Sequence, residues 1–445
     1  MRTRQISNLV EKAILEIIER YSIKEIHICL SGGMDSVCLL EVMTELTLPN
    51  SISLEVVHFN HRLSEYGNKA ERFCKKISAE KNLRFSPFQA PEDLQPTNNL
   101  EEWARGVRYD CISRNLKKSS LAVTAHHSKD QTETIIQRIL RGSGPYGLTG
   151  MTPLRKLGDG WLFRPFLGID KEELIKFSTI RKLKWTEDPM NQELRFSRNR
   201  IRHVIIPELD TLSNRLDKNL QKMARIQNDI VRYIEFLTEK AVIENLEDKR
   251  RVPLSLLEKV DERIKIFVLH AILRRFGIFK ISQKTLEEIL RQINQASRAK
   301  SPSFEIGDRV IKLHRNSLFV LKNCIDYNYR PKPSLWKITD PKEFSWGTLK
   351  CLNSQDDTIL NSNKHLIIKF RNNGDTISEA GRSSKKLKKI FQELSVPPWE
   401  RYLIPIIYES NEIIALGGYT MAFYSRSNEH KKQIIFDWKI YHSIL

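Results

Sequence analysis

The sequence has few cysteines and no long apolar run, and both absences restrict what this 445-residue chain can be. No stretch reaches the roughly 18–20 apolar residues that a membrane-spanning helix needs. The N-terminal segment mixes charged with apolar residues, as an amphipathic helix does and a signal peptide does not. No CxxC or CxxxC pair occurs, which argues against a zinc ribbon, a cysteine-ligated iron–sulfur cluster and a disulfide scaffold. We therefore expect a cytoplasmic protein without disulfides and without a membrane partner.

Acidic residues are fewer than basic residues, and most of this difference lies in the second part of the chain. The sequence holds 73 Lys and Arg against 54 Asp and Glu, a net charge of +19. Residues 1–194 carry 28 basic and 25 acidic side chains, whereas residues 195–445 carry 45 and 29. A basic excess can serve solubility alone, but this asymmetry favours a chemical domain joined to modules that hold a nucleic acid.

Strand and helix patterns alternate over the first 190 residues, which indicates a parallel sheet covered by helices on both faces. We expect strands at 25–30, 52–59, 83–88 and 121–125, and helices at 37–46, 65–82, 99–116 and 129–141. Active sites in such sheets lie beyond the carboxyl ends of the strands. The loops of interest are therefore 31–36, 58–64 and 126–130.

The rest of the chain changes character twice. Charged helical patterns cover 215–247, 261–275 and 282–297, and short β-like runs with Gly, Pro and Asn turns follow from about residue 300. We predict an α/β protein in which a nucleotide-binding domain with a parallel sheet precedes two smaller domains, one mainly helical and one α+β. The expected boundaries are 1–212, 213–330 and 331–445.

The motif SGGMDS at residues 31–36 follows a predicted strand and opens a predicted helix. Gly32 and Gly33 let the backbone turn tightly, and a helix N-terminus with successive N–H groups attracts an anion. Asp35 would repel a phosphate unless Mg²⁺ bridged the two. Because the Lys-Ser/Thr ending of a Walker A loop is missing, the motif predicts a different kind of phosphate site.

This motif resembles the pyrophosphate loop of the N-type ATP pyrophosphatases, which split ATP between its α and β phosphates and adenylate a carbonyl oxygen. Other segments narrow the choice: HFNHRL (58–63), LEEWARGVRY (100–109), TAHHSKDQTETIIQRILRGSGPYGLTGM (124–151), RPF (164–166), EDPMNQELRFSRNRIRHVIIPEL (187–209), FRNNGD (370–375), GRSSKKLKKIFQELSVPPWER (381–401) and GG (417–418). In order and spacing they are similar to the tRNA(Ile)-lysidine synthetase family over nearly the whole chain. The resemblance implies a ligase that uses ATP and Mg²⁺ to attach L-lysine to carbon 2 of the wobble cytidine in a CAU-anticodon isoleucine tRNA.

The first group of expected site residues serves ATP and the metal. It comprises Ser31, Gly32, Gly33, Met34, Asp35, Ser36, His58 and Asn60, with Asp35 as the metal ligand and a catalytic residue. His58 and Asn60 end a strand beside the loop, where they could contact adenine, ribose or the target base.

A second group is expected to handle lysine and the reacting atoms. Asp130 and Glu133 are three residues apart on a predicted helix, so they share a face and could hold the ammonium groups of lysine; they could equally cap the helix N-terminus. We expect Arg105 to be catalytic and Arg108 to bind lysine, unless both belong to a solvated face. His126 is expected in both roles, although a strand-end histidine can also be ordinary.

Two basic runs are expected to contact tRNA: Arg195, Arg198, Asn199, Arg200 and Arg202 in the first, and Lys385, Lys386, Lys388, Lys389, Trp399 and Arg401 in the second. The sequence departs from the family pattern at Arg62, Ser64, Met190 and Lys129, the last placing a cation beside the expected lysine pocket. The oligomeric state stays open.

Three alternatives remain. A tRNA thiolase would use catalytic cysteines, and no cysteine here lies in such a motif. A non-catalytic tRNA-binding protein would not need an intact pyrophosphate loop. A small-molecule synthetase such as GMP synthetase is disfavoured by the basic second part of the chain.

Overall fold

The computed structural model describes residues 2–90, 100–213, 215–240, 251–295, 302–322, 332–351, 365–371, 376–377, 385–409, 412–418 and 436–440. The chain divides into two compact units, Met1–Arg232 and Tyr233–Leu445. The boundary falls inside a long helix, α10 (Leu216–Thr238). None of the helices in these described residues is both long enough and apolar enough to span a membrane.

The first unit is built on a six-stranded sheet with the order β3-β2-β1-β4-β6-β5. All neighbouring strands are parallel except β5 and β6, which form an antiparallel hairpin. The strands are β1 (Glu25–Cys29), β2 (Ser53–Asn60), β3 (Arg84–Gln89), β4 (Ser120–Val123), β5 (Leu154–Leu157) and β6 (Gly160–Phe163). The predicted α/β class with a parallel sheet is confirmed, and the hairpin is an addition that the sequence patterns did not indicate.

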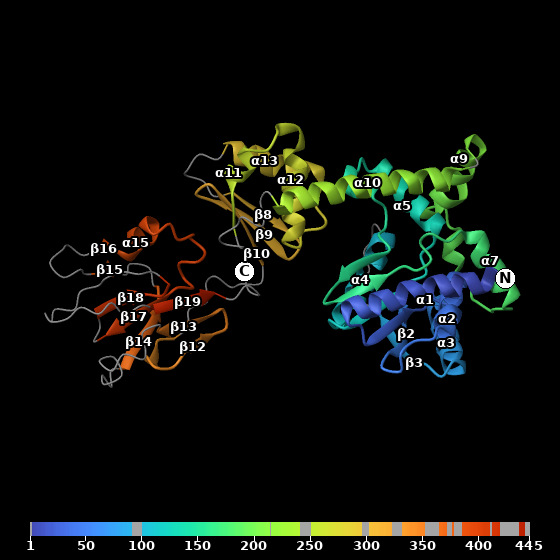
Figure 1. Cartoon of the computed structure of the whole chain (residues 1–445), viewed down its shortest axis with the longest axis horizontal. Helices are drawn as coiled ribbons and strands as arrows, with labels where there is room; N and C mark the ends of the chain where they lie inside the picture. The colour runs from blue at the N-terminus through green and yellow to red at the C-terminus, as the bar shows by residue number, and fades with distance from the viewer. Residues whose placement is uncertain are drawn as a thin grey trace. The chain divides into compact units, whose positions relative to one another are not determined.

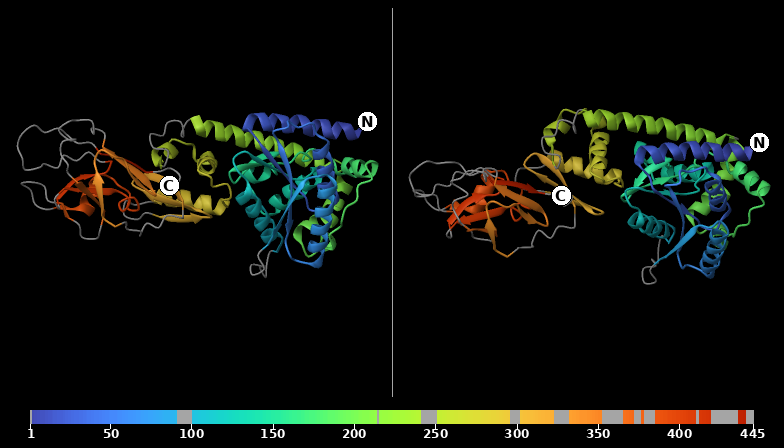
Figure 2. Two further views of the ribbon diagram at one scale, coloured as in Figure 1. Left: turned by 90° about the horizontal axis from the view of Figure 1, so that it is seen from below. Right: turned by 60° about the horizontal axis from the view of Figure 1, so that its bottom comes forward.

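Helices cover both faces of this sheet, as Figures 1 and 2 show. Side chains of β4 alternate between the faces: Leu121 and Val123 join the core formed with α1, α2 and α7, whereas Ala122 packs with Ile112 of α4 and with Leu116, which directly follows α4. The helices that flank the sheet are α1 (Arg2–Tyr21), α2 (Met34–Glu45), α3 (Glu65–Glu80), α4 (Leu100–Asn115), α5 (Ser128–Leu140) and α7 (Lys171–Ile180).

A broken helical segment packs on α5 and completes the first unit. It comprises α8 (Ser197–Arg200), a π-helical turn at Ile201–Ile205 and α9 (Ile206–Leu212). The short helix α6 (Pro145–Leu148) follows α5 in the sequence. Ile136 of α5 forms a small core with Ile201 and Ile206. This core fixes the basic run of residues 195–203 beside α5.

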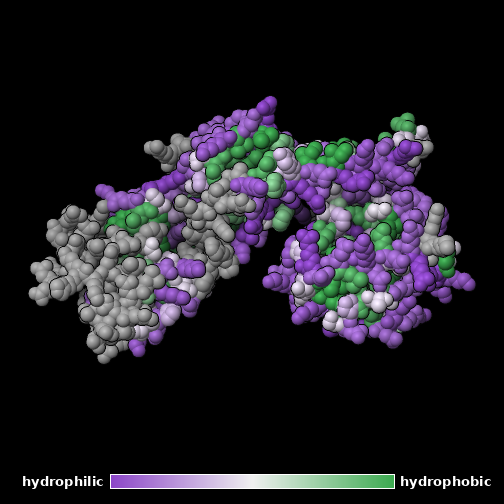
Figure 3. Space-filling view, viewed as in Figure 1, coloured by the Kyte–Doolittle hydropathy of each residue, from purple (hydrophilic) through white to green (hydrophobic). Residues whose placement is uncertain are grey.

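The second unit begins with helices packed on a small sheet. The helices are α11 (Leu254–Glu258), α12 (Glu262–Arg275) and α13 (Gln283–Gln295), and the sheet has the order β7-β10-β9-β8, with β7 (Arg251–Pro253), β8 (Ser303–Ile306), β9 (Arg309–His314) and β10 (Ser317–Lys322). Figure 3 shows apolar side chains at the surface in the region of α10. Ile226, Ile230 and Tyr233 are large side chains of this helix that are exposed.

The remaining elements of the second unit are antiparallel strands with one described helix, α15 (Leu387–Glu393). One sheet has the order β11-β14-β17-β18 and another β12-β13-β19, and β15 pairs with β16. Their bounds are β11 (Ser334–Lys337), β12 (Lys342–Phe344), β13 (Gly347–Cys351), β14 (His365–Phe370), β15 (Thr376–Ile377), β16 (Lys385–Lys386), β17 (Pro405–Glu409), β18 (Glu412–Leu416) and β19 (Phe436–Ile440). The three-domain division drawn from the sequence stays a prediction.

Candidate active site

The loop between β1 and α2 is held in shape by the hydroxyl of Ser36. Its Oγ accepts hydrogen bonds from the backbone nitrogens of Ser31 at 3.1 Å and Gly32 at 3.2 Å, and donates to the Gly33 carbonyl at 2.8 Å. Gly32 has a φ of +90°, and a Cβ there would lie 2.9 Å from Thr186 Oγ1. The tight turn therefore needs glycine, and the Ser36 hydroxyl serves mainly to form the loop.

Asp35 lies in the first turn of α2 and faces two cationic or ionisable partners. Lys171 Nζ contacts its two carboxylate oxygens at 2.5 and 2.7 Å, and His127 Nε2 lies 3.6 Å from Oδ2. Burial raises the pKa of Asp35, but His127 and Lys171 together lower it below its usual value. Asp35 is therefore a charged carboxylate at neutral pH.

Sequence reasoning missed Lys171. It is the first residue of α7, and a cation is disfavoured at a helix N-terminus because the helix dipole is positive there. A lysine at the start of a helix is therefore a weak signal of a specific anionic partner. The tertiary structure identifies that partner as Asp35, 136 residues away.

His127 connects the loop to the acidic residues of α5. Its Nε2 lies 3.6 Å from Asp35 Oδ2 and 3.5 Å from Asp130 Oδ2, and its backbone N–H donates to Asp130 at 3.0 Å. Asp130 therefore also caps the start of α5, which is the alternative that the sequence left open. Asp130 nevertheless adjoins the pyrophosphate loop through this one imidazole.

Asp130 and Glu133 share a face of α5, as their spacing predicts, but that face already carries two guanidinium groups. Arg198 contacts Glu133 at 2.6 Å and Asp130 at 2.7 Å, and Arg202 Nε contacts Glu133 at 2.5 Å. Glu133 is fully buried. Burial raises the pKa of Asp130, but His127 and Arg198 lower it well below its usual range. Arg198 and Arg202, expected on a tRNA surface, are engaged inside the first unit.

His126 and Lys129 flank this acidic pair without joining it. Thr124 Oγ1 lies 2.9 Å from His126 Nδ1, and burial lowers the pKa of His126 well below its ordinary value. His126 is therefore neutral at physiological pH. Lys129 Nζ lies 2.7 Å from Glu172 on α7, so its cation is paired away from the acidic residues.

His58 and Asn60 differ in what they can offer a ligand. Asn60 donates to Asn68 and Glu71, both at 3.0 Å, and accepts from the Arg62 backbone at 2.9 Å, so it holds the loop after β2. Its expected contact with ATP would have to displace one of these bonds. His58 Nδ1 lies 2.8 Å from the Leu30 carbonyl, while Nε2 is buried without a partner in the described structure.

Arg105 and Arg108 lie beside Tyr109 rather than on a solvated face. Their guanidinium carbons are 5.6 and 5.7 Å from the Tyr109 ring centroid. Glu101, an acidic residue in the first turn of α4, accepts a hydrogen bond from Ser197 Oγ at 3.5 Å. Burial, followed by neighbouring positive charges, lowers the pKa of Arg105. Both arginines thus belong to a crowded cationic region next to the acidic site.

The first run of expected tRNA contacts is split by the structure. Asn199 is buried and donates to the carbonyls of Met190 at 2.8 Å and Glu193 at 3.0 Å, which stabilises the loop before α8. Arg195 pairs with Glu193 at 2.5 Å but is largely exposed. Arg195 and Arg200 are the arginines of this run that remain on the surface.

The second run is split in the same way. Lys386, Lys388 and Lys389 are exposed, and the side chain of Lys385 lies outside the described residues. Trp399 and Arg401 are each only 7% exposed. Trp399 packs on His314 and Phe319, and Arg401 Nε donates to the Val396 carbonyl at 3.0 Å. We expected both at a tRNA surface; their burial instead makes them part of the interior of the second unit.

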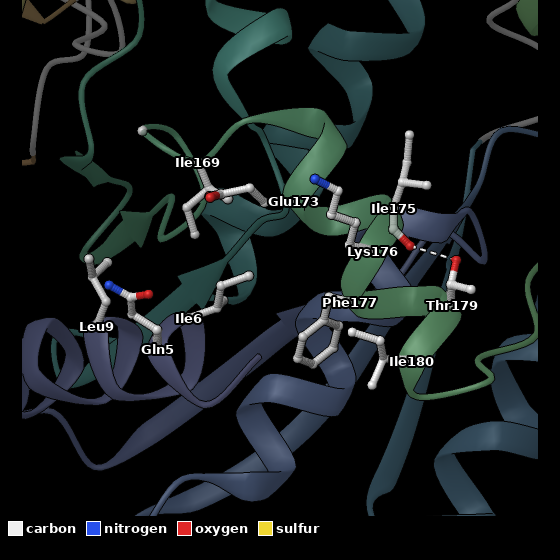
Figure 4. A pocket seen from close by; sticks show the side chains of 11 residues that line it. Gln5, Ile6, Leu9, Ile169, Glu173, Ile175, Lys176, Phe177, Thr179 and Ile180 are labelled. Carbon is white, nitrogen blue, oxygen red and sulfur yellow. Dashed lines mark hydrogen bonds between the residues drawn. The ribbon is translucent and has the colours of Figure 1, made fainter. Parts of the chain in front are cut away.

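A separate pocket of about 450 Å³ lies between α1 and α7. Figure 4 shows that apolar side chains line most of it, among them Ile6, Leu9 and Phe177. None of the expected site residues lines this pocket, so it is distinct from the loop and the acidic pair.

Comparisons with known proteins identify the family of the chain. The PP-loop domain family matches residues 6–209, and the TilS substrate C-terminal domain matches residues 366–438. The tRNA(Ile)-lysidine synthase of Coxiella burnetii is 31% identical over 398 residues, which cover 88% of each chain. The one from Buchnera aphidicola is 29% identical over an alignment of 460 positions, and the alignment covers 96% of this chain and 97% of that protein. The chain therefore belongs to the tRNA(Ile)-lysidine synthase family.

Proposed function

We propose that this chain attaches L-lysine to carbon 2 of the wobble cytidine in CAU-anticodon isoleucine tRNA, which changes codon reading from AUG to AUA. Family membership makes it a ligase that forms a carbon–nitrogen bond and uses ATP. We place the reaction in the cytoplasm. The observation that carries the proposal is that His127 contacts both Asp35 of the pyrophosphate loop and Asp130 of the acidic pair. A phosphate site and a candidate ammonium site therefore adjoin.

The first step activates the cytidine. Its carbon-2 oxygen attacks the α-phosphorus of ATP, a phosphorus–oxygen bond forms, and the bond to the β-phosphate bridge breaks so that pyrophosphate leaves. The loop and the N-terminus of α2 are expected to receive this pyrophosphate. Arg105 is proposed to stabilise negative charge at the α-phosphate.

Mg²⁺ fits the loop as a partner of Asp35. No group of three or more His, Cys, Asp or Glu side chains in the described residues forms a dedicated metal cage. Mg²⁺ is commonly held by one or two carboxylates together with substrate phosphates. The oxygens of Asp35 already face a cation, the ammonium of Lys171. Bound there, Mg²⁺ would neutralise phosphate charge, with Asp35 as its protein ligand.

The second step brings in lysine. Its ε-amine, with a pKa of about 10.4, must lose a proton to a nearby carboxylate or His before it attacks carbon 2. The new carbon–nitrogen bond then replaces the bond to AMP, which leaves. We propose that Asp130 and Glu133 hold the ammonium form, and that Arg108 and His126 complete the lysine site. Because the pKa of Asp130 is held well below its usual range, this carboxylate suits binding a cation better than accepting a proton. Lysine would replace a guanidinium contact of Arg198 or Arg202.

Thiol chemistry has little support from the described cysteines. Burial raises the pKa of Cys29, Cys38 and Cys74 to about 12, and burial also raises that of Cys111. A nucleophilic cysteine needs a lowered pKa to form thiolate. This favours lysine transfer over tRNA thiolation.

Nucleoside analysis tests the proposal directly. The purified protein is incubated with ATP, Mg²⁺, labelled lysine and an isoleucine tRNA transcript that carries CAU, and the digested RNA is analysed by mass spectrometry. We expect lysidine to form, with AMP and pyrophosphate in equal amounts. A matched transcript with uridine at the wobble position should remain unmodified. Incorporation of labelled sulfur, or AMP release without lysidine, would contradict the proposal.

A further inference from the structure

Four arginines approach the side chain of Tyr109 at one edge of the sheet, and a fifth lies near two of them. Arg105, Arg108 and Arg155 place their guanidinium carbons 5.6, 5.7 and 5.1 Å from its ring centroid. Arg164 Nη2 donates to the Tyr109 hydroxyl at 3.4 Å. The fifth member, Arg138, is near enough for Arg105 and Arg164 to lower its pKa. We call these five side chains and Tyr109 the arginine cluster.

The arginine cluster lacks carboxylate partners. Within the described part of the chain, none of its five arginines forms an ion pair, whereas Arg181, Arg198 and Arg202 each contact a carboxylate. Arg164 is 3% exposed, and its Nε has no hydrogen-bond partner among the described atoms. A buried donor without a partner is costly, and clustered like charges repel. Such an arrangement is typical of a site that receives an anion.

The pKa values of two groups in the cluster have the direction expected where positive charge is in excess. Burial and then neighbouring arginines lower the pKa of Arg138 to about 10. Burial raises the pKa of Tyr109, but Arg164, Arg105 and Arg108 outweigh it and bring the value to about 8. Both shifts have the direction that a local positive potential produces.

Two members of the cluster, Arg155 and Arg164, lie away from the expected position of the ATP phosphates. Arg164 directly follows β6, and Leu154, beside Arg155, pairs with Phe163, so both arginines lie at the carboxyl end of β6. The strand order β1-β4-β6 places the pyrophosphate loop two strands away, roughly 10 Å at about 4.8 Å per strand. The candidate lysine site follows β4, between them. An anion at β6 therefore lies on the far side of the reacting centre from the departing pyrophosphate.

We propose that Arg155 and Arg164, on the β6 side of the arginine cluster, bind a phosphodiester group of the tRNA anticodon loop next to the target cytidine, while Arg105 and Arg108 keep the roles proposed above. The inference rests on the proposed function, because it takes tRNA as the substrate. Guanidinium groups match phosphate oxygens with paired N–H donors, and the Tyr109 hydroxyl can add another. Such a contact carries little sequence information but fixes the register of the nucleotide chain. It would hold the cytidine base over the carboxyl end of β4.

Arg155 offers the cleanest test, because a matched control lies beside it on β5. Lys156 carries the same charge but alternates to the other face of the strand, where its Nζ lies 4.3 Å from the Trp161 ring centroid. The dissociation constant for tRNA is measured across a KCl series for Arg155→Gln, Arg155→Lys and Lys156→Gln in the full chain. Arg155→Gln should weaken binding about tenfold and reduce the log–log salt slope by about 0.7, the value for one single-strand phosphate.

The two control variants separate charge from fold. Lys156→Gln should leave affinity and slope unchanged, and Arg155→Lys should recover most of the slope because it keeps the cation. Ethylation of one phosphate in the anticodon loop should weaken tRNA binding to the unmodified protein. The same ethylation should cause no further loss of affinity in Arg155→Gln. Equal slopes for all four proteins would overturn the proposal.

Two further measurements identify the anion. Arg155→Gln should leave the dissociation constant for ATP and the KM for lysine unchanged; a rise in either, with normal tRNA binding, would assign the cluster to ATP or to the lysine carboxylate instead. Lysidine formation by the unmodified protein is followed in parallel. A protein that makes no lysidine but shows the Arg155-dependent salt slope would contradict the proposed function and still support the phosphate site.

Discussion

Replacing Glu133 by Gln should destabilise the first unit far more than the same change at Glu172. Glu133 is fully buried and accepts three guanidinium contacts of 2.5, 2.6 and 3.0 Å from Arg202 and Arg198. Breaking a buried ion pair by removing one charge costs about 3–5 kcal/mol. Glutamine keeps one acceptor oxygen and Asp130 keeps its charge, so we expect about 3 kcal/mol. Glu172 is 56% exposed in its pair with Lys129, and such pairs contribute below about 1 kcal/mol.

Hydrogen exchange followed by mass spectrometry measures this difference within the unit concerned. Amides in α5 that exchange only by unfolding of the unit should lose protection about 100-fold in Glu133→Gln, since about 1.4 kcal/mol corresponds to tenfold. Glu172→Gln should lose less than about fivefold. Equal losses would refute the reasoning, and a loss below tenfold in Glu133→Gln would show that Asp130 alone neutralises both arginines.

Three further expectations concern the reaction, the arginine cluster and the second unit. Asp35→Asn should nearly abolish pyrophosphate release while the dissociation constant for tRNA stays unchanged; normal release would remove Asp35 from the chemistry. Tyrosinate absorbance should show one group ionising near pH 8 in the intact protein and missing in Tyr109→Phe, because the surrounding arginines favour the phenolate; bound tRNA should raise that pKa. Neutralising Lys388 and Lys389 to Gln should flatten the salt dependence of tRNA binding without loss of helicity, and an unchanged slope would mark them as a solvated face.

Local patterns were sufficient for the framework of the first unit. Short apolar runs and helical runs located β1 to β4 and the helices between them within a few residues, because a sheet covered by helices on both faces needs largely apolar strands. The motif at 31–36 predicted its own turn, since the positive φ of Gly32 and the Ser36 hydroxyl act within six residues. The β5–β6 hairpin was missed because each strand has only four residues, too short for a periodic signal.

Partners of charged side chains could not be derived in this way. The sequence placed Asp130 and Glu133 on one helical face, and it placed Arg198 and Arg202 in a basic run, but nothing local indicated that the four side chains meet across more than 60 residues. An ion pair depends on the path of the chain between its members, and a basic run looks the same whether it faces RNA or a buried carboxylate. Trp399 and Arg401 illustrate the same limit, since both are buried in the folded unit, Trp399 against His314 of β9 and Phe319 of β10.

What the sequence by itself determined is the family resemblance, the α/β class and a pyrophosphate loop with its carboxylate, because these features reside in short contiguous motifs. The tertiary structure decided which charges neutralise one another: Lys171 with Asp35, Arg198 and Arg202 with the acidic pair, and the arginine cluster with no carboxylate among the described residues. Electrostatic energy falls off with distance in space and not along the chain. Only the folded arrangement therefore shows which positive charges remain for a ligand.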